Sequence, residues 1–405
     1  MKVKLRAAIG TLLAVWAEYR VTVSGFEVKG LHPRPSHRFA KIAVLSFFGR
    51  HNGISAGALW QIDALTEAGI SAFQLDVTAA IRNPLFRLSA ESTGAPSCMV
   101  IHTDGQRVAV ALSAIPRAMR SAFRVGYCAW ELPDPPLAWG RFDRFLHEVW
   151  TPSEFSRLAL QKMCEKPVRV VRHVVRAPTN VNDRAMRDRL GLSDSDFVVL
   201  AMADVRSSLA RKNPFGAIAA FRQGLGTHAN AVLVLKVSGA DHDPTTFASL
   251  QAALDGSRVV LLLDRLSMDE QWQLYAACDV FISLHRAEGY GLPMAEAMAI
   301  GRPVVGTGWS GNLDFMNATN SALVDYKLVE INDPQGVYAG STWAEPSVAH
   351  AAEWLGRLHA SSDLRAELGN AAAQSMTISQ QMKEFNNQIR STHLVDSEKK
   401  MERTS

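Results

Sequence analysis

The feature that most constrains the fold is a series of short, continuous apolar runs separated by segments of helical character. The runs are rich in Val, Ile, Leu and Phe. Continuous apolar strands that alternate with helices are typical of parallel sheets covered on both faces. In the first half of the chain the predicted strands are 41–48, 71–77, 98–104, 123–130, 148–153 and 168–175. In the second half they are 197–204, 231–237, 258–264, 279–284 and 303–307.

A polar segment from Pro178 to about Asp196 separates the two series of strands. The length of 405 residues suits two or three domains. We therefore predict an α/β fold with two doubly wound, Rossmann-like domains of parallel sheet that face each other across a cleft, with ligands at the carboxyl ends of the strands. The predicted parts are a basic N-terminal extension (1–40), a first domain (41–178), a second domain (179–375), and a C-terminal helix with a charged tail (376–405).

Basic residues are concentrated at the N-terminus. Residues 1–40 hold seven Lys and Arg residues against two Glu residues, whereas the whole chain has a formal net charge of +4. The apolar run 7–17 has 11 residues, and a membrane span needs roughly 20. It has no clear small-residue cleavage site before Glu18, which argues against a signal peptide. Two interpretations remain, namely an ordinary helix or frayed tail, and a helix that lies on an anionic membrane surface.

The four cysteines are widely and irregularly spaced, and no CxxC pair occurs. This spacing predicts neither a disulfide framework nor a zinc site, and it suits a reducing compartment. We expect a cytoplasmic protein, with peripheral contact to the inner face of the plasma membrane if the N-terminal helix binds lipid.

The most informative string is HRAEGYGLPMAEAMAIG, at residues 285–301. It places Glu288 and Glu296 with seven residues between them. A strand is predicted to end near Leu284, Pro293 suits the first position of a helix, and Gly301 suits its end. Glu288 is therefore predicted in a loop, and Glu296 in the first turn of the helix.

The residue types around these glutamates suggest a ligand. Gly289 and Gly291 allow backbone N–H groups to approach it closely, and the start of a helix attracts phosphate. A carboxylate repels phosphate but accepts hydrogen bonds from sugar hydroxyls. An acid on each side of a phosphate site therefore suggests a nucleotide sugar. The alternative is an acidic loop in which Glu296 only stabilises a helix start.

The segment EGYGLPMAEAMAIGRPVVGT resembles the signature of the family 4 retaining glycosyltransferases, which have the GT-B fold. The similarity is to a bacterial branch of the family and covers about residues 41–350. Further segments that resemble the family are GYCAWELPDPP (126–136), VWTPSEFSRLA (149–159), DVRSSLARKNPFGAIAAF (204–221), TGWSGNLDFM (307–316), LVDY (323–326) and WAEP (343–346).

The resemblance implies a role for each residue of the signature. Glu296 would bind the ribose hydroxyls of the nucleotide, and Glu288 would contact the transferred sugar. Four residues would contribute backbone contacts to the sugar and diphosphate: Gly289, Tyr290, Gly291 and Leu292.

The resemblance also implies a pair of cations that binds the diphosphate. Lys212 would be one member, and either Arg206 or Arg211 would be the other. The alternative is a solvated loop before a helix, with Asn213 as the N-cap and Pro214 at the first helical position. Both interpretations can hold together, because this geometry would also aim the loop at the cleft.

Three first-domain residues are weaker candidates. Gly53, in the string RHNGISAGA (50–58) that also contains Gly57, would lie in a glycine-rich turn facing the donor phosphates. Some members of the family have a histidine at the end of a strand near the reacting carbon, but here that strand ends in GYCAWEL. Trp130 and Glu131 therefore become candidates for acceptor binding, although a tryptophan beside an apolar strand can simply belong to the core.

The resemblance implies a retaining, metal-independent hexosyltransferase. It would transfer a hexose from a nucleotide diphosphate sugar to a saccharide or lipid-linked acceptor, in the biosynthesis of a bacterial surface polysaccharide. We expect no cofactor, no metal and no nucleic-acid partner. The acidic strings DSD (194–196) and DHD (241–243) are interpreted as turns and not as metal motifs. The alternatives are a GT-B-fold epimerase or phosphorylase, and a non-catalytic subunit that binds a nucleotide sugar.

Overall fold

The computed structural model describes residues 2–30, 41–50, 53–89, 96–254 and 258–392. Part of the predicted basic extension, His51 and Asn52 of the glycine-containing string, and the charged tail 396–405 lie outside these residues. The chain forms two compact units. The N-terminal unit comprises residues 1–130, 134–174 and 381–405, and the C-terminal unit comprises residues 131–133 and 175–380.

The N-terminal unit is built on a six-stranded parallel sheet with the order β2-β1-β3-β4-β5-β6. Every first-half strand predicted from the sequence is present. The strands are β1 (Ile42–Ser46), β2 (Ala72–Asp76), β3 (Cys98–His102), β4 (Phe123–Tyr127), β5 (Glu148–Thr151) and β6 (Val168–Val170). The helices of this unit are α1 (Lys2–Val23), α2 (Gly53–Glu67), α4 (Gly105–Ser113), α5 (Glu154–Gln161) and most of α14 (Ile378–Ser391).

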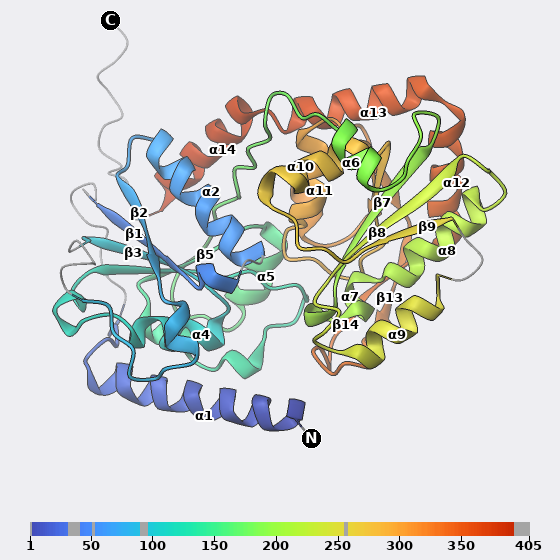
Figure 1. Ribbon diagram of the computed structural model, residues 1–405. Coiled ribbons are helices and arrows are strands. Elements are labelled where there is room, and N and C mark those ends of the chain that lie inside the picture. The colour runs from blue at the N-terminus through green and yellow to red at the C-terminus, as the bar shows by residue number, and fades with distance from the viewer. Residues whose placement is uncertain (1, 31–40, 51–52, 90–95, 255–257, 393–405) are drawn as a thin grey trace, which may run out of the picture. The chain divides into compact units, whose positions relative to one another are not determined.

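The continuous apolar strands exist because both faces of this sheet are buried. Along β1, Ile42 and Val44 pack into one core with α2 and α14, whereas Ala43 and Leu45 pack into a second core with α4 and α1. Figure 1 shows these helices on the two faces of the sheet. Alternation of apolar and polar residues is not needed in a strand that is covered on both sides.

Helix α1 is a packed part of the N-terminal unit. Ala17 and Val21 are 2% and 1% exposed and lie in the same core as α4. The opposite side of the helix is apolar as well, and its large residues are exposed: Leu12, Val15, Tyr19 and Val23. The frayed-tail interpretation is therefore wrong for the described part of this segment, and none of the described residues covers the apolar face that Leu12, Val15, Tyr19 and Val23 form. None of the described helices is both long and apolar enough to cross a membrane.

The C-terminal unit contains a second parallel sheet, with the order β12-β11-β10-β7-β8-β9. All five second-half strands predicted from the sequence are present, and β12 was not predicted. The strands are β7 (Phe197–Asp204), β8 (Ala231–Ser238), β9 (Val259–Leu262), β10 (Val280–Ser283), β11 (Val304–Thr307) and β12 (Ala322–Val324). The helices are α6 (Arg184–Arg189), α7 (Leu209–Lys212), α8 (Pro214–Leu225), α9 (Pro244–Ala252), α10 (Met268–Ala277), α11 (Leu292–Ala299), α12 (Val348–Ala360) and α13 (Ser362–Ser375).

Helices cover both faces of this sheet too. Val280 and Ile282 of β10 lie in a core with α8 and α12. Phe281 points to the other face, where its ring lies 5.8 Å from that of Tyr275 in α10. The sequence did not predict the antiparallel hairpin of β13 (Tyr326–Glu330) and β14 (Thr342–Pro346), whose first strand is largely exposed.

Helix α14 completes the core of the N-terminal unit. Phe385 is 1% exposed and packs with Ile42 and Val44. We expect Phe385→Ala to lower the free energy of unfolding by about 3–5 kcal/mol, because it leaves a cavity in a closed core. The matched control is Ile378→Ala at the start of the same helix, where the side chain is 39% exposed. Urea unfolding followed by circular dichroism measures both, and an equal, small effect of the two variants would contradict the packing.

Candidate functional site

The candidate site lies where the strand order of the C-terminal unit reverses. Strands β7 and β10 are neighbours in the sheet, and the chain leads away from them in opposite directions, to β8 and β11. Loops that follow such a pair of strands leave a crevice at their carboxyl ends, where α/β proteins bind ligands. The loop after β7 carries Arg206, Arg211 and Lys212, and the loop after β10 carries Glu288.

Backbone and side-chain hydrogen bonds join these two loops directly. The Arg286 N–H donates to the Arg211 carbonyl at 2.7 Å, and the Asn213 side-chain amide donates to the Leu284 carbonyl at 2.9 Å. Asn213 has φ +49° and caps α8 through a hydrogen bond from the Gly216 N–H, and Pro214 is the first helical residue. The predicted N-cap is therefore confirmed, and Asn213, which directly follows Lys212, ties the end of α7 to Leu284, the residue after β10.

Glu288 is the centre of a buried ion group. Its carboxylate pairs with the ammonium of Lys212 and lies 3.3 Å from the guanidinium of Arg211. The glutamate side chain is 9% exposed and that of Arg211 is 4% exposed. Burial alone would raise the pKa of Glu288, but Lys212 and then Arg211 outweigh burial and hold the pKa at about 2. Glu288 is therefore ionised at neutral pH and can only accept hydrogen bonds.

Of the two arginines proposed as the partner of Lys212, Arg211 is the one that joins it at Glu288. Arg206 instead makes a two-pronged ion pair with Asp204, at 2.9 and 2.7 Å. Its side chain is 43% exposed and packs over Gly239, where a Cβ atom would lie 2.8 Å from the Arg206 Cγ. Whether either arginine binds a diphosphate stays a prediction.

A second loop fixes the backbone of Glu288. The Glu288 N–H donates to the Ser310 hydroxyl at 3.0 Å, and the Glu288 carbonyl accepts from the Gly311 N–H at 2.9 Å. Gly311 must be glycine, because a Cβ atom there would lie 2.3 Å from the Gly289 carbonyl oxygen. His285 is fully buried, and its Nε2 lies 3.0 Å from the Asn312 Oδ1. Burial lowers the pKa of His285.

The glycine-rich turn leads into α11, which begins at Leu292, one residue before the predicted start at Pro293, so Glu296 lies in the second turn of the helix and not in the first. Gly291 is the N-cap with φ +97°, and no side chain caps the helix. The first N–H group of α11, on Leu292, is therefore available to a ligand or water. Tyr290 is 5% exposed and packs against Phe315, with ring centroids 4.9 Å apart. Gly301 ends the helix with φ +76°, as predicted.

Glu296 lies on α11 in a different environment from Glu288. It is 4% exposed, and its Oε2 accepts hydrogen bonds from the Tyr275 hydroxyl and, at 2.9 Å, from the Gln271 amide. Burial raises its pKa to about 7, and the hydrogen bonds from Tyr275 and Gln271 oppose this shift only partly. Neither Tyr275 nor Gln271 was recognised from the sequence, since both come from α10, a helix with no recognised motif.

The two acceptor candidates, although consecutive in the chain, are assigned to different units. Trp130 belongs to the N-terminal unit, where its ring packs edge-on against Trp139 with centroids 5.3 Å apart. Glu131 belongs to the C-terminal unit. Burial raises the pKa of Glu131, whereas Arg211 and a hydrogen bond with Tyr338 lower it. Glu131 is thus part of the same charge network as Arg211 and Glu288, whereas Trp130 is partly buried and packs against the core of the N-terminal unit.

The glycines of the first domain are not a single turn. Gly53 is the exposed first residue of α2. Gly57 lies inside the helix, and a Cβ atom there would lie 2.4 Å from the His173 ring. The interpretation of Gly57 as part of a turn is therefore wrong, because its missing side chain makes room for His173.

The two acidic strings have structural partners. Asp196 accepts from the Ser193 N–H at 2.7 Å and pairs with Arg258, and Asp243 caps α9 through the Thr246 N–H at 3.1 Å. Both strings are turns, as predicted. Among the residues that the structure describes, no group of three or more His, Cys, Asp and Glu side chains is arranged to hold a metal ion.

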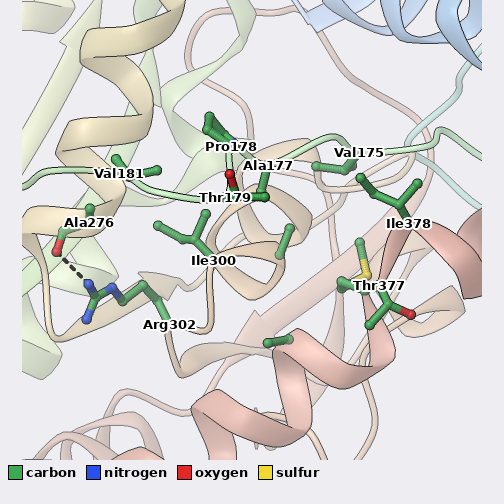
Figure 2. A pocket seen from close by; sticks show the side chains of 13 residues that line it. Val175, Ala177, Pro178, Thr179, Val181, Ala276, Ile300, Arg302, Thr377 and Ile378 are labelled. Atoms are coloured by element: carbon green, nitrogen blue, oxygen red, sulfur yellow. Dashed lines mark hydrogen bonds between the residues drawn. The ribbon is translucent and has the colours of Figure 1, made fainter.

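A cavity of about 490 Å³ lies elsewhere in the C-terminal unit (Figure 2). Its lining is mostly apolar and comes from residues 175–181, the ends of α10 and α11, and the segment between α13 and α14. The polar side chain Arg302 lines it and donates to the Ala276 carbonyl at 2.7 Å. None of Lys212, Glu288 and Glu296 lines this cavity, so it is separate from the candidate site.

The pKa of Glu296 predicts how stability depends on pH. A carboxyl whose pKa rises from 4.5 to about 7 on folding binds more protons in the folded state. The free energy of unfolding therefore falls as pH rises through this range, by on the order of 3 kcal/mol. We expect Glu296→Gln to remove this loss, so that the variant gains stability relative to wild type between pH 5 and pH 8. Urea unfolding at a series of pH values measures the difference.

Glu288→Gln is the contrasting variant. The pKa of Glu288 falls on folding, so its contribution to stability is fully present above about pH 4.5 and is lost as pH falls towards 2. This variant should be less stable than wild type at pH 8, and the difference should shrink in acid. The same sign of pH dependence for both variants would contradict the two environments described above.

Comparison with known proteins supports the resemblance seen in the sequence. Residues 182–334 match the family model described as "Glycosyl transferases group 1". No curated protein matches the chain.

Several solved structures share the fold over most of the chain. HepE of Anabaena, solved with UDP and glucose, has a TM-score of 0.60 at 17% identity and covers 88% of this chain and 100% of its own. A glycosyltransferase of Rickettsia africae has a TM-score of 0.62 at 11% identity, with coverage of 88% and 100%. WaaG, a glycosyltransferase involved in lipopolysaccharide biosynthesis, has a TM-score of 0.55 at 14% identity, with coverage of 87% and 100%. The chain therefore has the GT-B fold of these glycosyltransferases, and its residues 182–334 match the model of the group 1 family.

Proposed function

We propose that this protein is a retaining glycosyltransferase that moves a hexose from a nucleotide diphosphate sugar to a saccharide or lipid-linked acceptor. The observation that carries the proposal is the buried ion group of Glu288, Lys212 and Arg211 at the reversal of strand order between β7 and β10. The match of residues 182–334 to the group 1 family supports the activity. The complex of HepE with UDP-glucose makes that compound the first donor to test.

Each part of the site has a role in this proposal. Lys212, with Arg211 or Arg206, binds the diphosphate, and the backbone from Gly289 to Leu292 contacts the sugar and the phosphates. Glu288, ionised because its pKa is about 2, accepts hydrogen bonds from the transferred sugar. Glu296 accepts hydrogen bonds from the ribose, and its Oε2 is already oriented by Tyr275 and Gln271.

The cations favour the transition state over the ground state. Negative charge on the leaving diphosphate grows as the glycosidic bond breaks, so fixed positive charge lowers the barrier most when the bond is nearly broken. Retention follows if the acceptor attacks from the face on which the diphosphate leaves, with a diphosphate oxygen taking the acceptor proton. No side chain then needs to act as a nucleophile, and no metal is needed to neutralise the leaving group.

Binding of the donor is the first test. We expect one of UDP, GDP and ADP, free or linked to a sugar, to raise the melting temperature of the wild-type protein. A ligand at 100 times its dissociation constant stabilises by roughly 2.7 kcal/mol. Glu296→Ala should lose most of the shift, because a ribose contact disappears. Glu353→Ala, a change at an exposed position of α12, is the control and should keep the shift.

The same assay separates the alternatives. Binding without transfer to any saccharide or lipid-linked acceptor favours the non-catalytic subunit, and a phosphate-dependent or epimerised product favours a phosphorylase or epimerase. NMR of the product reports the anomeric configuration, and an inverted product would overturn the retaining assignment. Transfer should persist in the presence of a chelator.

We also propose that the enzyme works at an anionic membrane surface in the assembly of a bacterial surface polysaccharide. The support is the uncovered apolar face of α1, made by Leu12, Val15, Tyr19 and Val23, together with the basic excess of residues 1–40. Apolar side chains on one side of a helix enter the headgroup region, and basic residues attract anionic lipid.

The vesicle test changes exposed residues only. Deletion of residues 1–20 would also remove the buried Ala17, so we choose the combined substitution Leu12→Gln, Val15→Gln and Tyr19→Gln. This variant should sediment less with phosphatidylserine-containing vesicles, at an unchanged melting temperature. The control is Leu137→Gln, a change at a leucine that is 79% exposed elsewhere in the same unit. Equal sedimentation of all three proteins would remove the membrane proposal.

A further inference from the structure

The loop between β13 and β14 makes specific hydrogen bonds to the loop that carries Arg211 and Lys212. Figure 1 shows the hairpin beside α7. Asp333 accepts a hydrogen bond from the Ser208 hydroxyl at 3.0 Å. Gln335 accepts from the Leu209 N–H at 2.6 Å and donates to the Val205 carbonyl at 2.9 Å. The partners are about 125 residues apart in the chain, so only tertiary structure brings them together.

The segment that these bonds hold has a strained backbone. Ser208 is fully buried and has φ +61°, a conformation that non-glycine residues adopt rarely. Its hydroxyl accepts from the Arg211 N–H at 3.1 Å while it donates to Asp333. Such a conformation persists only where the surroundings over-determine it. Asp333 and Gln335 supply that constraint at the start of α7. Ser208 lies three residues before Arg211 and four residues before Lys212.

The hairpin loop is itself rigidified around Asp333. The Asp333 carboxylate accepts from the N–H groups of Gln335, Val337 and Tyr338, at 3.2, 2.9 and 3.1 Å. The ring of Tyr338 then lies 5.7 Å from the Arg211 guanidinium, and its hydroxyl is hydrogen-bonded to Glu131. One acid thus orders the loop, holds Ser208 and places an aromatic ring against Arg211.

We propose that the β13–β14 loop positions the cations of the donor site, with Asp333 and Gln335 as positioning residues. The family match ends at residue 334, so Gln335 and Tyr338 lie beyond it. The inference rests on the proposed function in one respect, namely that Lys212 and its arginine bind the diphosphate. The other part of the inference can be tested without any nucleotide, namely that Asp333 and Gln335 fix the Val205–Asn213 segment.

The test compares Gln335→Ala with Val337→Ala. The first variant loses both hydrogen bonds to the Val205–Leu209 segment, whereas Val337 has a side chain that is 50% exposed in the same loop. Hydrogen exchange of the backbone amides of residues 205–213 is the first readout. We expect at least a tenfold faster exchange in Gln335→Ala and wild-type rates in Val337→Ala. Unchanged exchange in both variants would overturn the proposal, whatever the protein binds.

Nucleotide affinity is the second readout. With UDP, or the diphosphate that the wild-type protein prefers, Gln335→Ala should bind about tenfold more weakly, a change that the loss of one or two hydrogen bonds can produce. The affinity for the matching nucleoside, which has no phosphate, should stay at the wild-type value. An equal loss for nucleotide and nucleoside would mean a general disturbance of the unit and would overturn the positioning role.

The two hypotheses fail in different ways. If wild type binds no nucleoside diphosphate, the proposed function is wrong, and the exchange rates still decide whether the loop holds the Val205–Asn213 segment. If wild type binds and Gln335→Ala binds equally well, the proposed function stands and the positioning role is wrong.

Asp333→Asn, which keeps one carbonyl oxygen as an acceptor, should give values between those of wild type and Asp333→Ala, both in amide exchange rate and in nucleotide affinity.

Discussion

The ion group of Glu288, Lys212 and Arg211 sets the chemistry of the C-terminal unit, because three charged groups share a site that excludes most water. In such surroundings an unpaired charge is costly, so the loops after β7 and β10 cannot move independently without separating opposite charges. Asn213 ties these two loops to each other, the turn at Gly311 holds the loop after β10, and the β13–β14 loop holds the segment after β7. Separation of Glu288 from Lys212 and Arg211 would leave buried charges unpaired, and this cost holds the two loops in one arrangement.

The two glutamates of the signature are buried to a similar extent and yet differ in protonation. Glu288 has two cations beside it and keeps its charge well into acid, whereas Glu296 has only neutral donors and titrates near pH 7. The same residue type is thus ionised at neutral pH in the loop before α11 and titratable near neutral pH in the second turn of that helix. A ligand with phosphates in the middle and hydroxyls at both ends matches this distribution of charge.

The sequence predicted the strands and the signature well, for physical reasons that differ. Strands such as β1 and β8 are buried on both faces, so their apolar runs could hardly be anything else. Pro214 and Pro293 mark helix starts because proline lacks the N–H that a helix start leaves unpaired. The misses come from long-range contacts. A glycine-rich string suggests a turn at Gly57, although this glycine makes room for His173 inside a helix. The choice between Arg206 and Arg211 depends on their ion pairs with Asp204 and Glu288, and the spacing of residues in the sequence does not show these pairs. Asp333, Gln335 and Tyr338 have no recognisable motif, because their partners are hydrogen-bonding groups of a distant loop.

The course of the chain through the two units has a consequence for how such a protein can be divided or recombined. The chain leaves the N-terminal unit at Val174 and returns to it at Gln381, where α14 completes the core. Apart from residues 131–133, the C-terminal unit is thus topologically an insertion between these two junctions. A shortened chain that stops before α14 would lose part of the N-terminal unit, although the missing residues follow the C-terminal unit in the sequence. Exchange of the C-terminal unit between relatives would therefore have to preserve both of these junctions, and joining two chain halves at a single point would not be enough.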